Sequence, residues 1–231
     1  MTGYDIRCVP VSETSVMLYL ADVIDAGLAP AVGETARAIL DELPEVREVT
    51  PSYTSILVEV GSLGSDFEAL AGALSAIACR VLETGESELL GKLIELPVYY
   101  DPEVGEDLES LAEFAGLSVD EVIGIHTGRE YSVCAIGFAP GFAFLGEVDE
   151  RIAMPRQVTP RSHVPAGSVG IAGRQTAVYP ADTPGGWQLI GNCPVSLYDP
   201  ENDPPSPLEV GDRVRFCPIE REVFLERGGH V

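Results

Sequence analysis

Lysine is almost absent from this chain. Of the 231 residues only Lys92 is a lysine, so arginine supplies the rest of the 14 basic residues, against 37 aspartates and glutamates. The formal net charge is -23. Such an excess of carboxylates repels polyanions, which argues against nucleic acid and anionic membranes as partners. A surface rich in carboxylates and poor in lysine suits strong salt, so we expect a halophilic protein; an ordinary acidic protein is the alternative.

Long apolar runs and secretory features are also missing. No stretch of 18 apolar residues occurs, and the N-terminal sequence MTGYDIRCVPVSET lacks a basic start followed by an apolar block. We therefore expect a cytoplasmic protein. Hydrophobic residues still make up 45% of the chain, which is enough to build a buried core.

Residues that could hold a metal ion are few and scattered. No two cysteines form a CxxC pair, and none of the three histidines stands at metal-ligand spacing from another. We expect reduced thiols and no metal site. The cysteines and histidines of the chain are Cys8, Cys79, Cys134, Cys193, Cys217, His126, His163 and His230.

The first ninety residues alternate between strand and helix patterns. Residues 5–21 and 45–60 each indicate two strands. Residues 30–44 have apolar side chains at helical spacing (Ala36, Ile39, Leu40 and Leu43) up to Pro44, and residues 65–83 indicate a second amphipathic helix capped by Ser65 or Asp66. The order ββαββα predicts a small α+β sandwich with both helices on one face of an antiparallel sheet.

A second pattern begins near Gly91, where we predict a boundary between domains 1–90 and 91–231. Gly116 is placed to end one short helix, and the sequence from Ser118 to Glu121 is a capping box that opens the next. After Tyr131 short apolar runs are separated by glycine and proline. This spacing is typical of a β-barrel.

One segment lacks acidic residues, in contrast to the rest of the chain. Residues 151–181 contain no aspartate or glutamate, and Arg156 and Arg161 each follow a proline directly. Proline restricts the backbone, and arginine binds carboxylate or phosphate through two parallel hydrogen bonds. We therefore expect both arginines to bind an anion. The alternative is that they neutralise carboxylates from elsewhere in the fold.

Glycine- and proline-bearing turns on either side of this segment place aromatic rings where they can wall a pocket. GFAPGFAFLG, residues 137–146, matches neither the dinucleotide fingerprint nor the phosphate loop. Core packing is the alternative role for its rings. The predicted pocket-forming residues are Phe138, Pro140, Gly141, Phe142, Pro165, Gly167, Gly185, Gly186 and Trp187, the last being the chain's single tryptophan.

Ser168 lies in AGSVG, which differs from the nucleophile elbow GxSxG at its first residue. The elbow also requires a following helix, whereas the residues after Ser168 have a strand pattern. A role in a turn or in a hydrogen bond to substrate is therefore favoured over a nucleophile. Gln175 and Tyr179 join Ser168 as predicted substrate-binding residues, and the sequence identifies no catalytic residue.

Three stretches of the chain resemble a known family: GFAPGFAFLG, MPRQVTPRSHVPAGSVGIAGRQTAVYPADTPGGWQLIG and GDRVRF. They are similar to the B subunit (PxpB) of bacterial and archaeal 5-oxoprolinase, whose family includes the histidine kinase inhibitor KipI and proteins labelled allophanate hydrolase subunit 1. They also resemble half of the carboxyltransferase region of urea carboxylase, subdomains C and D. One departure is visible, because Glu106 stands where the family has proline before Asp107.

The resemblance implies a ferredoxin-like N-terminal α/β sandwich followed by a cyclophilin-like β-barrel. It implies a protein that helps to open the lactam of 5-oxoproline to glutamate, with ATP, expected as Mg-ATP, as cofactor of the complex. The implied partners are the C-type (KipA-like) and A-type (LamB/YcsF-like) subunits, without which we expect no activity. A KipI-like kinase inhibitor and one part of an allophanate- or urea carboxylase-type carboxyltransferase are the alternatives. Which of the three subunits binds ATP stays open.

Overall fold

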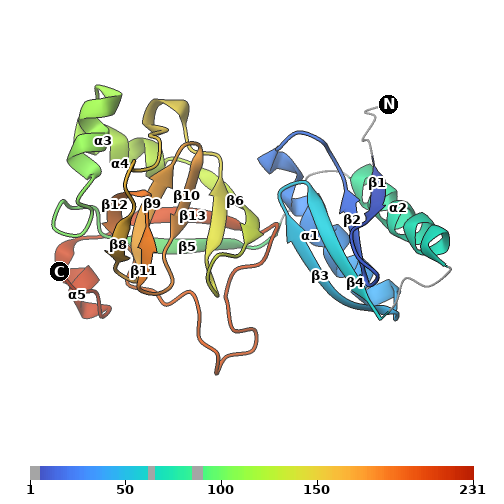
Figure 1. The fold of residues 1–231 in the computed structure, drawn as a ribbon. Helices are drawn as coiled ribbons and strands as arrows, with labels where there is room; N and C mark the ends of the chain where they lie inside the picture. The colour runs from blue at the N-terminus through green and yellow to red at the C-terminus, as the bar shows by residue number, and fades with distance from the viewer. Residues whose placement is uncertain (1–5, 62–65, 85–90) are drawn as a thin grey trace. The chain divides into compact units, whose positions relative to one another are not determined.

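The computed structural model describes residues 6–61, 66–84 and 91–231, and its secondary structure mixes helices with mainly antiparallel strands (Figure 1). The chain divides into two compact units. The first comprises residues 1–91 together with 210–212, and the second comprises residues 92–209 and 213–231. Among the described residues, no helix is both long and apolar enough to cross a membrane.

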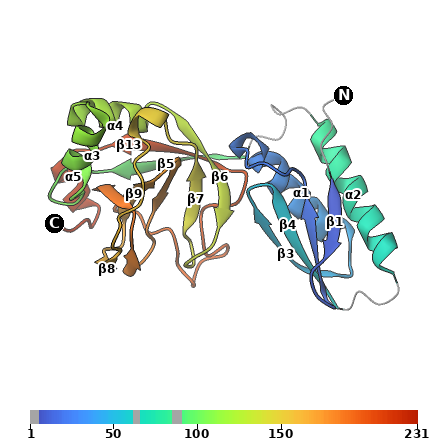
Figure 2. The same cartoon turned by 45° about the horizontal axis from the view of Figure 1, so that its top comes forward.

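The first unit is an antiparallel sheet in the order β1-β2-β4-β3. Helices α1 and α2 contact each other and the sheet, as expected for two helices on one face (Figure 2). The elements are β1 (Arg7–Pro10), β2 (Ser15–Tyr19), the 3-10 helix η1 (Ala26–Leu28), α1 (Ala29–Glu42), β3 (Val46–Ser52), β4 (Ser55–Val60) and α2 (Phe67–Glu83). The predicted order ββαββα is confirmed, whereas Ser65 lies outside the described residues.

The sequence of helix α1 explains where the helix begins and ends and, in part, which of its side chains are buried. Proline occupies its first turn, where a backbone N–H would have no partner, and the helix ends before Pro44. Ile39 is fully buried, as its spacing predicts, but its neighbour Leu40 is 47% exposed. Helical spacing places Leu40 on the apolar face, so the buried stripe of α1 is narrower than the sequence suggests.

Residues 210–212 belong to the first unit although they are distant from it in sequence. Gly33 of α1 lies against Val210 so closely that a Cβ atom there would overlap its carbonyl oxygen. Gly211 has a positive φ of 96° and packs against Ala29 and Pro30. A division into residues 1–90 and 91–231 omits this contribution, and two independent domains stay a prediction.

The second unit is a larger sheet in the order β5-β13-β6-β7-β10-β9-β12. β5 and β13 are parallel, and the remaining neighbours are antiparallel. A bridge between Tyr99, which follows β5, and Asn192 of β12 joins the two ends of this order. The strands are β5 (Leu93–Val98), β6 (Glu130–Ile136), β7 (Ala143–Gly146), β9 (Ser168–Ala172), β10 (Gln175–Val178), β12 (Gln188–Asn192) and β13 (Arg213–Pro218).

Shorter elements complete the second unit. Strands β8 (Arg161–Val164) and β11 (Thr183–Gly185) pair with each other, and the helices are η3 (Glu150–Ile152), α3 (Leu108–Ala115), α4 (Val119–Thr127) and α5 (Arg221–Glu226). α3 ends at Gly116 in a left-handed conformation, and Ser118 and Glu121 form the predicted capping box of α4. The α+β class is thus confirmed, while the ferredoxin-like and cyclophilin-like assignments stay predictions.

His126 forms a polar centre in the core of the second unit. Its Nδ1 lies 2.8 Å from the Tyr100 hydroxyl and its Nε2 lies 3.0 Å from the Thr176 hydroxyl. Because Thr176 donates to the carbonyl of Gly170, it accepts from Nε2–H, and Nδ1 accepts from Tyr100. Phe216 stacks on the imidazole at 4.6 Å, and burial lowers the pKa of His126 to about 3.

Candidate functional site

A cavity of about 280 Å³ in the second unit collects many of the residues that the sequence singles out. It lies where the loop after η3 meets the turn between β11 and β12. Seven predicted residues line it, namely Phe138, Phe142, Arg156, Tyr179, Gly185, Gly186 and Trp187, together with Phe144, Pro160 and Pro184. The sequence prediction of an aromatic pocket beside the positive segment therefore corresponds to one place in the fold.

Aromatic rings form the inner wall of the cavity. Phe142 is 1% exposed and meets Phe144, Tyr179 and Trp187 edge to face, with ring centroids 4.9, 5.3 and 5.6 Å apart. Such edge-to-face pairs add to the stability gained by burying the rings. The wall also forms part of the hydrophobic core, so these rings both pack and line the cavity, and their role toward a ligand stays a prediction.

Arg156 provides the positive charge at the cavity. Its guanidinium carbon lies 5.7 Å from the centroid of the Trp187 ring, a distance at which a cation is attracted to an indole face. The side chain is exposed. Within the part of the chain that the structure describes, it forms no ion pair with a carboxylate. The guanidinium is therefore available to an anion entering the cavity.

Arg161 has a different role. Its Nη2 donates to both carboxylate oxygens of Asp107 at 2.7 Å, its Nη1 donates to the carbonyl of Trp187 at 3.1 Å, and its Nε pairs with Glu106 at 2.9 Å. All three nitrogens are thus engaged by the protein, and Arg161 does not line the cavity. This geometry favours the alternative expectation, in which Arg161 neutralises carboxylates from elsewhere in the fold. The carboxylates that it neutralises lie about fifty residues earlier in the chain.

Two glutamines connect this ion pair to the cavity loop. The side-chain amide of Gln157 donates to Asp107 at 3.0 Å and to the side-chain oxygen of Gln188 at 2.8 Å. Gln188 in turn donates to the carbonyl of Pro155 at 2.6 Å, and the backbone N–H of Gln157 donates to the carbonyl of Gly186 at 2.7 Å. The residues on both sides of Arg156 are therefore fixed, while its side chain projects freely.

Tyr179 separates this cavity from a second one of about 350 Å³, which it also lines. Burial raises the pKa of Tyr179, and a backbone hydrogen bond from Trp187 and the charges of Arg156 and Arg161 oppose that shift. The second cavity contains Pro165 and Gly167, both predicted to form a pocket. Gly167 has a φ of 80°, and a Cβ atom there would overlap the carbonyl of Cys193.

Four further predicted residues line neither cavity. Ser168 is 1% exposed in β9, and its hydroxyl has no hydrogen-bond partner among the described residues. Gln175 begins β10, at the end of the strand remote from Tyr179. Pro140 is exposed, and Gly141 shapes its loop, since a Cβ atom there would lie 2.6 Å from the carbonyl of Leu197. The assignments of Ser168 and Gln175 to substrate and of Pro140 and Gly141 to the pocket wall are therefore not supported.

Two strongly exposed apolar side chains lie on segments that contribute to the Arg156 cavity. Phe138 is 68% exposed and has a φ of 73°, which is rare for a residue other than glycine. Val158, between Arg156 and Pro160, is 101% exposed. Among the described large hydrophobic residues of the second unit these two are the most exposed. Backbone strain of this kind is concentrated at functional sites.

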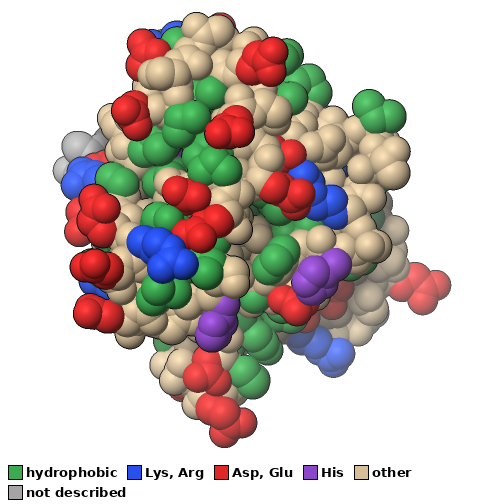
Figure 3. Space-filling view, turned by 90° about the vertical axis from the view of Figure 1, so that its left-hand side faces the viewer, with side chains coloured by type: hydrophobic (Ala, Val, Ile, Leu, Met, Phe, Trp, Pro, Cys, Tyr) green, Lys and Arg blue, Asp and Glu red, His purple; other side chains and the backbone are tan. Residues whose placement is uncertain are grey.

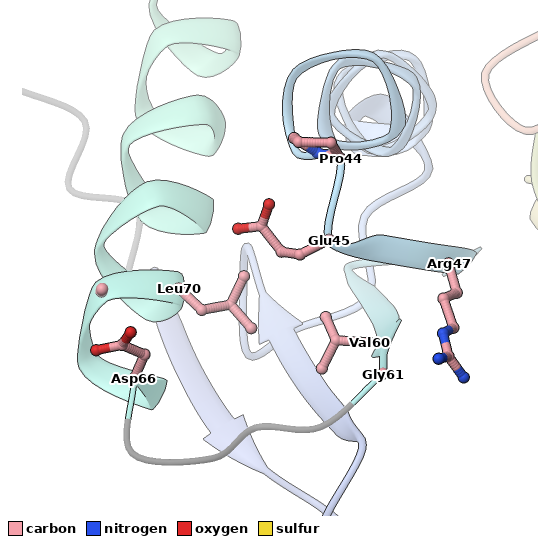
Figure 4. A pocket seen from close by; sticks show the side chains of 8 residues that line it. Pro44, Glu45, Arg47, Val60, Gly61, Asp66 and Leu70 are labelled. Carbon is pink, nitrogen blue, oxygen red and sulfur yellow. The ribbon is translucent and has the colours of Figure 1, made fainter.

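A larger hollow of about 690 Å³ lies in the first unit, and it also contains an arginine. Figure 4 shows Glu45 and Leu70 directed toward the hollow, whereas Arg47 and Asp66 stand on opposite sides of it and point away. Its charged side chains are exposed and of both signs. Residues 62–65, between Gly61 and Asp66, lie outside the described residues. Among the residues that line it, this hollow therefore has no preorganised binding group.

The chain as a whole is strongly negative, with a formal net charge of -23. Figure 3 shows one face of the molecule, on which acidic side chains are widely distributed and outnumber the basic ones. Most of the described arginines pair with carboxylates, for example Arg174 with Glu150 and Arg213 with Glu130. The guanidinium of Arg156 forms no ion pair with a carboxylate among the described residues, a property that it shares with Arg47, Arg129 and Arg227, but Arg156 alone of these lines the aromatic cavity. Chemically, the cavity combines one anion-binding group with flat apolar walls.

Comparisons with known proteins match most of the length of the chain. A family model described as carboxyltransferase domain, subdomain C and D, matches residues 6–208. The chain is 40% identical over 225 residues to the 5-oxoprolinase B subunit of Bacillus subtilis, covering 93% of each chain. It is 42% identical over 220 residues to the 5-oxoprolinase B subunit of Escherichia coli O157:H7, covering 94% of this chain and 98% of the relative.

A solved structure is also similar over most of the chain. A conserved uncharacterized protein from Pyrococcus horikoshii, PH0987, is 42% identical and superposes with a TM-score of 0.57. The match covers 94% of this chain and 99% of the archaeal protein. The similarity therefore extends over both units and is not confined to the motifs around the cavity.

Proposed function

Because the chain belongs to the carboxyltransferase domain, subdomain C and D, family, we propose that it is the B subunit of an ATP-dependent 5-oxoprolinase. The observation that carries this proposal is the identity of 40–42% to 5-oxoprolinase B subunits over more than nine-tenths of both chains. The reaction opens the lactam ring of 5-oxoproline and yields glutamate. We further propose a cytoplasmic location, a ferredoxin-like first domain and a cyclophilin-like second domain.

The Arg156 cavity is the proposed binding site for 5-oxoproline. The substrate is a five-membered lactam with one carboxylate, so it presents one anionic group and a small ring. The guanidinium of Arg156 can bind the carboxylate in a two-point hydrogen bond. The rings of Trp187 and Phe142 can contact the lactam ring, and a cavity of about 280 Å³ suits a ligand of this size.

When bound in the complex, ATP would supply a phosphoryl group to activate the amide oxygen of the lactam. Ring opening then consumes one water in breaking the C–N bond and a second in releasing phosphate, and the products are glutamate, ADP and phosphate. A single guanidinium with aromatic walls fits the carboxylate of 5-oxoproline better than a triphosphate. We therefore assign no residue of this chain to ATP. In this proposal the chain binds and orients the lactam.

Partner proteins complete the site in this proposal. Among the residues that line the cavity, only Arg156 and Tyr179 carry ionisable groups, and the pKa of Tyr179 is raised. Neither is a general base at neutral pH. We propose that the C-type (KipA-like) and A-type (LamB/YcsF-like) subunits supply the remaining groups, and that the exposed Phe138 and Val158 offer them an apolar contact surface. The isolated chain is then inactive.

The single tryptophan allows a direct test. Trp187 lines the cavity, so its fluorescence should change when 5-oxoproline binds to the complex reconstituted with the A-type and C-type subunits. In that complex Arg156→Ala should weaken substrate binding roughly 10- to 150-fold, which corresponds to a charge-assisted contact of about 1.5–3 kcal/mol. Arg156→Lys should restore only part of the affinity, because it keeps the charge and loses the planar fork.

Arg47→Ala is the matched control, since Arg47 is also an exposed arginine beside a hollow, but in the first unit. It should leave both 5-oxoproline hydrolysis and the Trp187 signal unchanged. If the reconstituted wild type hydrolyses 5-oxoproline but Arg156→Ala and Arg47→Ala lose activity equally, Arg156 has no special role. Absence of any 5-oxoproline-dependent ATP hydrolysis in the wild-type complex would refute the function itself.

A further inference from the structure

Asp107 is the best-connected buried carboxylate described in the second unit, and it lies outside the cavity. It is 6% exposed and immediately precedes α3. It accepts four hydrogen bonds: two from Arg161, one from the amide of Gln157, and one from the backbone N–H of Leu189 at 2.6 Å. A buried carboxylate is costly unless its oxygens are satisfied. Here each oxygen accepts two hydrogen bonds, so its geometry is fixed.

The donors to Asp107 come from the two segments that carry the ligand-binding pair. Gln157 directly follows Arg156, and Arg161 also binds the carbonyl of Trp187. Leu189 is two residues beyond Trp187, and its carbonyl accepts from the backbone N–H of Asp107 at 2.9 Å. One carboxylate thus connects the loop that carries Arg156 to the turn that carries Trp187.

The connection constrains Arg156 from both sides. Gln188 holds the carbonyl of Pro155, and Gln157 is held through its backbone and its side chain. The Arg156 side chain is exposed and would otherwise sample many rotamers. With its backbone fixed, it needs to lose less conformational freedom on binding a ligand.

We propose that Asp107 is a positioning residue for the Arg156–Trp187 pair. It does not touch the ligand; through Gln157 and Arg161 it fixes the backbone that carries Arg156 relative to the backbone that carries Trp187. The inference rests on the proposed function, because it concerns the same cavity. It adds a role for a carboxylate that neither lines the cavity nor reacts.

The test uses Asp107→Asn in the reconstituted complex. The amide has nearly the shape of the carboxylate, but its NH2 group must face a donor from Arg161, Gln157 or Leu189. We expect kcat/KM for 5-oxoproline to fall about 10- to 100-fold, mainly through KM, because small displacements of binding groups have effects of this size. We also expect the Trp187 emission of the unliganded complex to shift. Gln157→Met, which removes two hydrogen bonds and keeps the charge pair, should act in the same direction more weakly.

Asp149→Asn is the matched control. Asp149 also forms a two-point pair with an arginine, Arg151, in the second unit, but borders a different hollow. It should leave KM and the Trp187 emission unchanged. Melting curves first establish that Asp107→Asn and Gln157→Met are folded. If the wild type binds 5-oxoproline and both variants have the wild-type KM, the positioning role is overturned while the proposed function stands. If the wild-type complex shows no 5-oxoproline turnover, the proposed function fails first.

Discussion

The two units of the chain bury different kinds of side chain. The first unit buries mainly aliphatic residues, such as Leu18, Ile39 and Ile56, with Asp212 as its one described buried carboxylate, whereas the second buries Asp107 and His126 within hydrogen-bonded side-chain networks. Aliphatic packing stabilises a fold without directing any group to a fixed point, but hydrogen bonds are directional. The hollow in the first unit is the larger one, yet the cavity of the second unit has fixed walls. Preorganisation therefore distinguishes a candidate site better than volume does.

The largest effect should come from breaking the buried ion pair of the second unit. Arg161→Ala leaves Asp107 buried without its countercharge, and we expect a loss of about 3–5 kcal/mol in the free energy of unfolding. Arg80→Ala in the first unit removes an exposed, solvent-screened pair with Glu42, so its effect should be far smaller than that of Arg161→Ala. Denaturant unfolding of both variants measures the contrast. Equal small losses would show that the network of the second unit contributes no special stability.

The buried imidazole should make the stability of the second unit depend on pH. The folded pKa of His126 is about 3, whereas the unfolded chain takes up the proton near pH 6.5. Below pH 6.5 the unfolded state therefore binds more protons, and stability falls as the pH falls, by at most about 1.4 kcal/mol per unit and by about 2.3 kcal/mol in total between pH 6.5 and 4.5.

His126→Gln should remove the part of the pH dependence of the free energy of unfolding that this imidazole causes, although the substitution lowers stability at every pH. His163→Gln, at an exposed histidine of β8, is the control and should retain it. The measurement is the free energy of unfolding at several pH values. An unchanged slope in His126→Gln would mean that the imidazole is not kept neutral by burial.

The smallest contrast concerns two adjacent glycines in the cavity wall. A Cβ atom at Gly185 would overlap the hydroxyl of Tyr179, whereas at Gly186 the nearest atoms belong to Pro160 at 3.6 Å. Gly185→Ala should displace Tyr179, cost about 1–3 kcal/mol and weaken 5-oxoproline binding. Gly186→Ala should change neither quantity by more than about 0.5 kcal/mol. Melting curves and substrate titrations that fail to separate the two variants would argue against a tightly packed wall.

Much of the local structure was predictable because its causes are local. The α1 helix with its stop at Pro44, the Gly116 terminus and the Ser118–Glu121 capping box follow from neighbouring residues. The aromatic cavity was predictable in part, since its rings lie on turns marked by glycine. The exposure of Leu40 was not predictable, because helical spacing gives a face but not the width that neighbouring elements cover.

The roles of Asp107 and Arg161 were not predictable, because they depend on contacts between distant parts of the chain. Arg161 and Asp107 are 54 residues apart, and Gln188 lies a further 27 residues on. The absence of acids near Arg161 in the sequence suggested a free cation, but pairing in space does not follow proximity in sequence. The only sequence signal for Asp107 was its position in a family motif, which gave no reason for its carboxylate.

The imidazole of His126 also has a use as a probe. Its Nε2 proton is donated to Thr176 inside a fully buried ring cluster, so water can reach it only when the surrounding strands separate. The exchange rate of that single proton for deuterium therefore reports how often the second unit opens. Followed by NMR, it would show whether partner proteins or 5-oxoproline keep the unit closed, without any label or substitution.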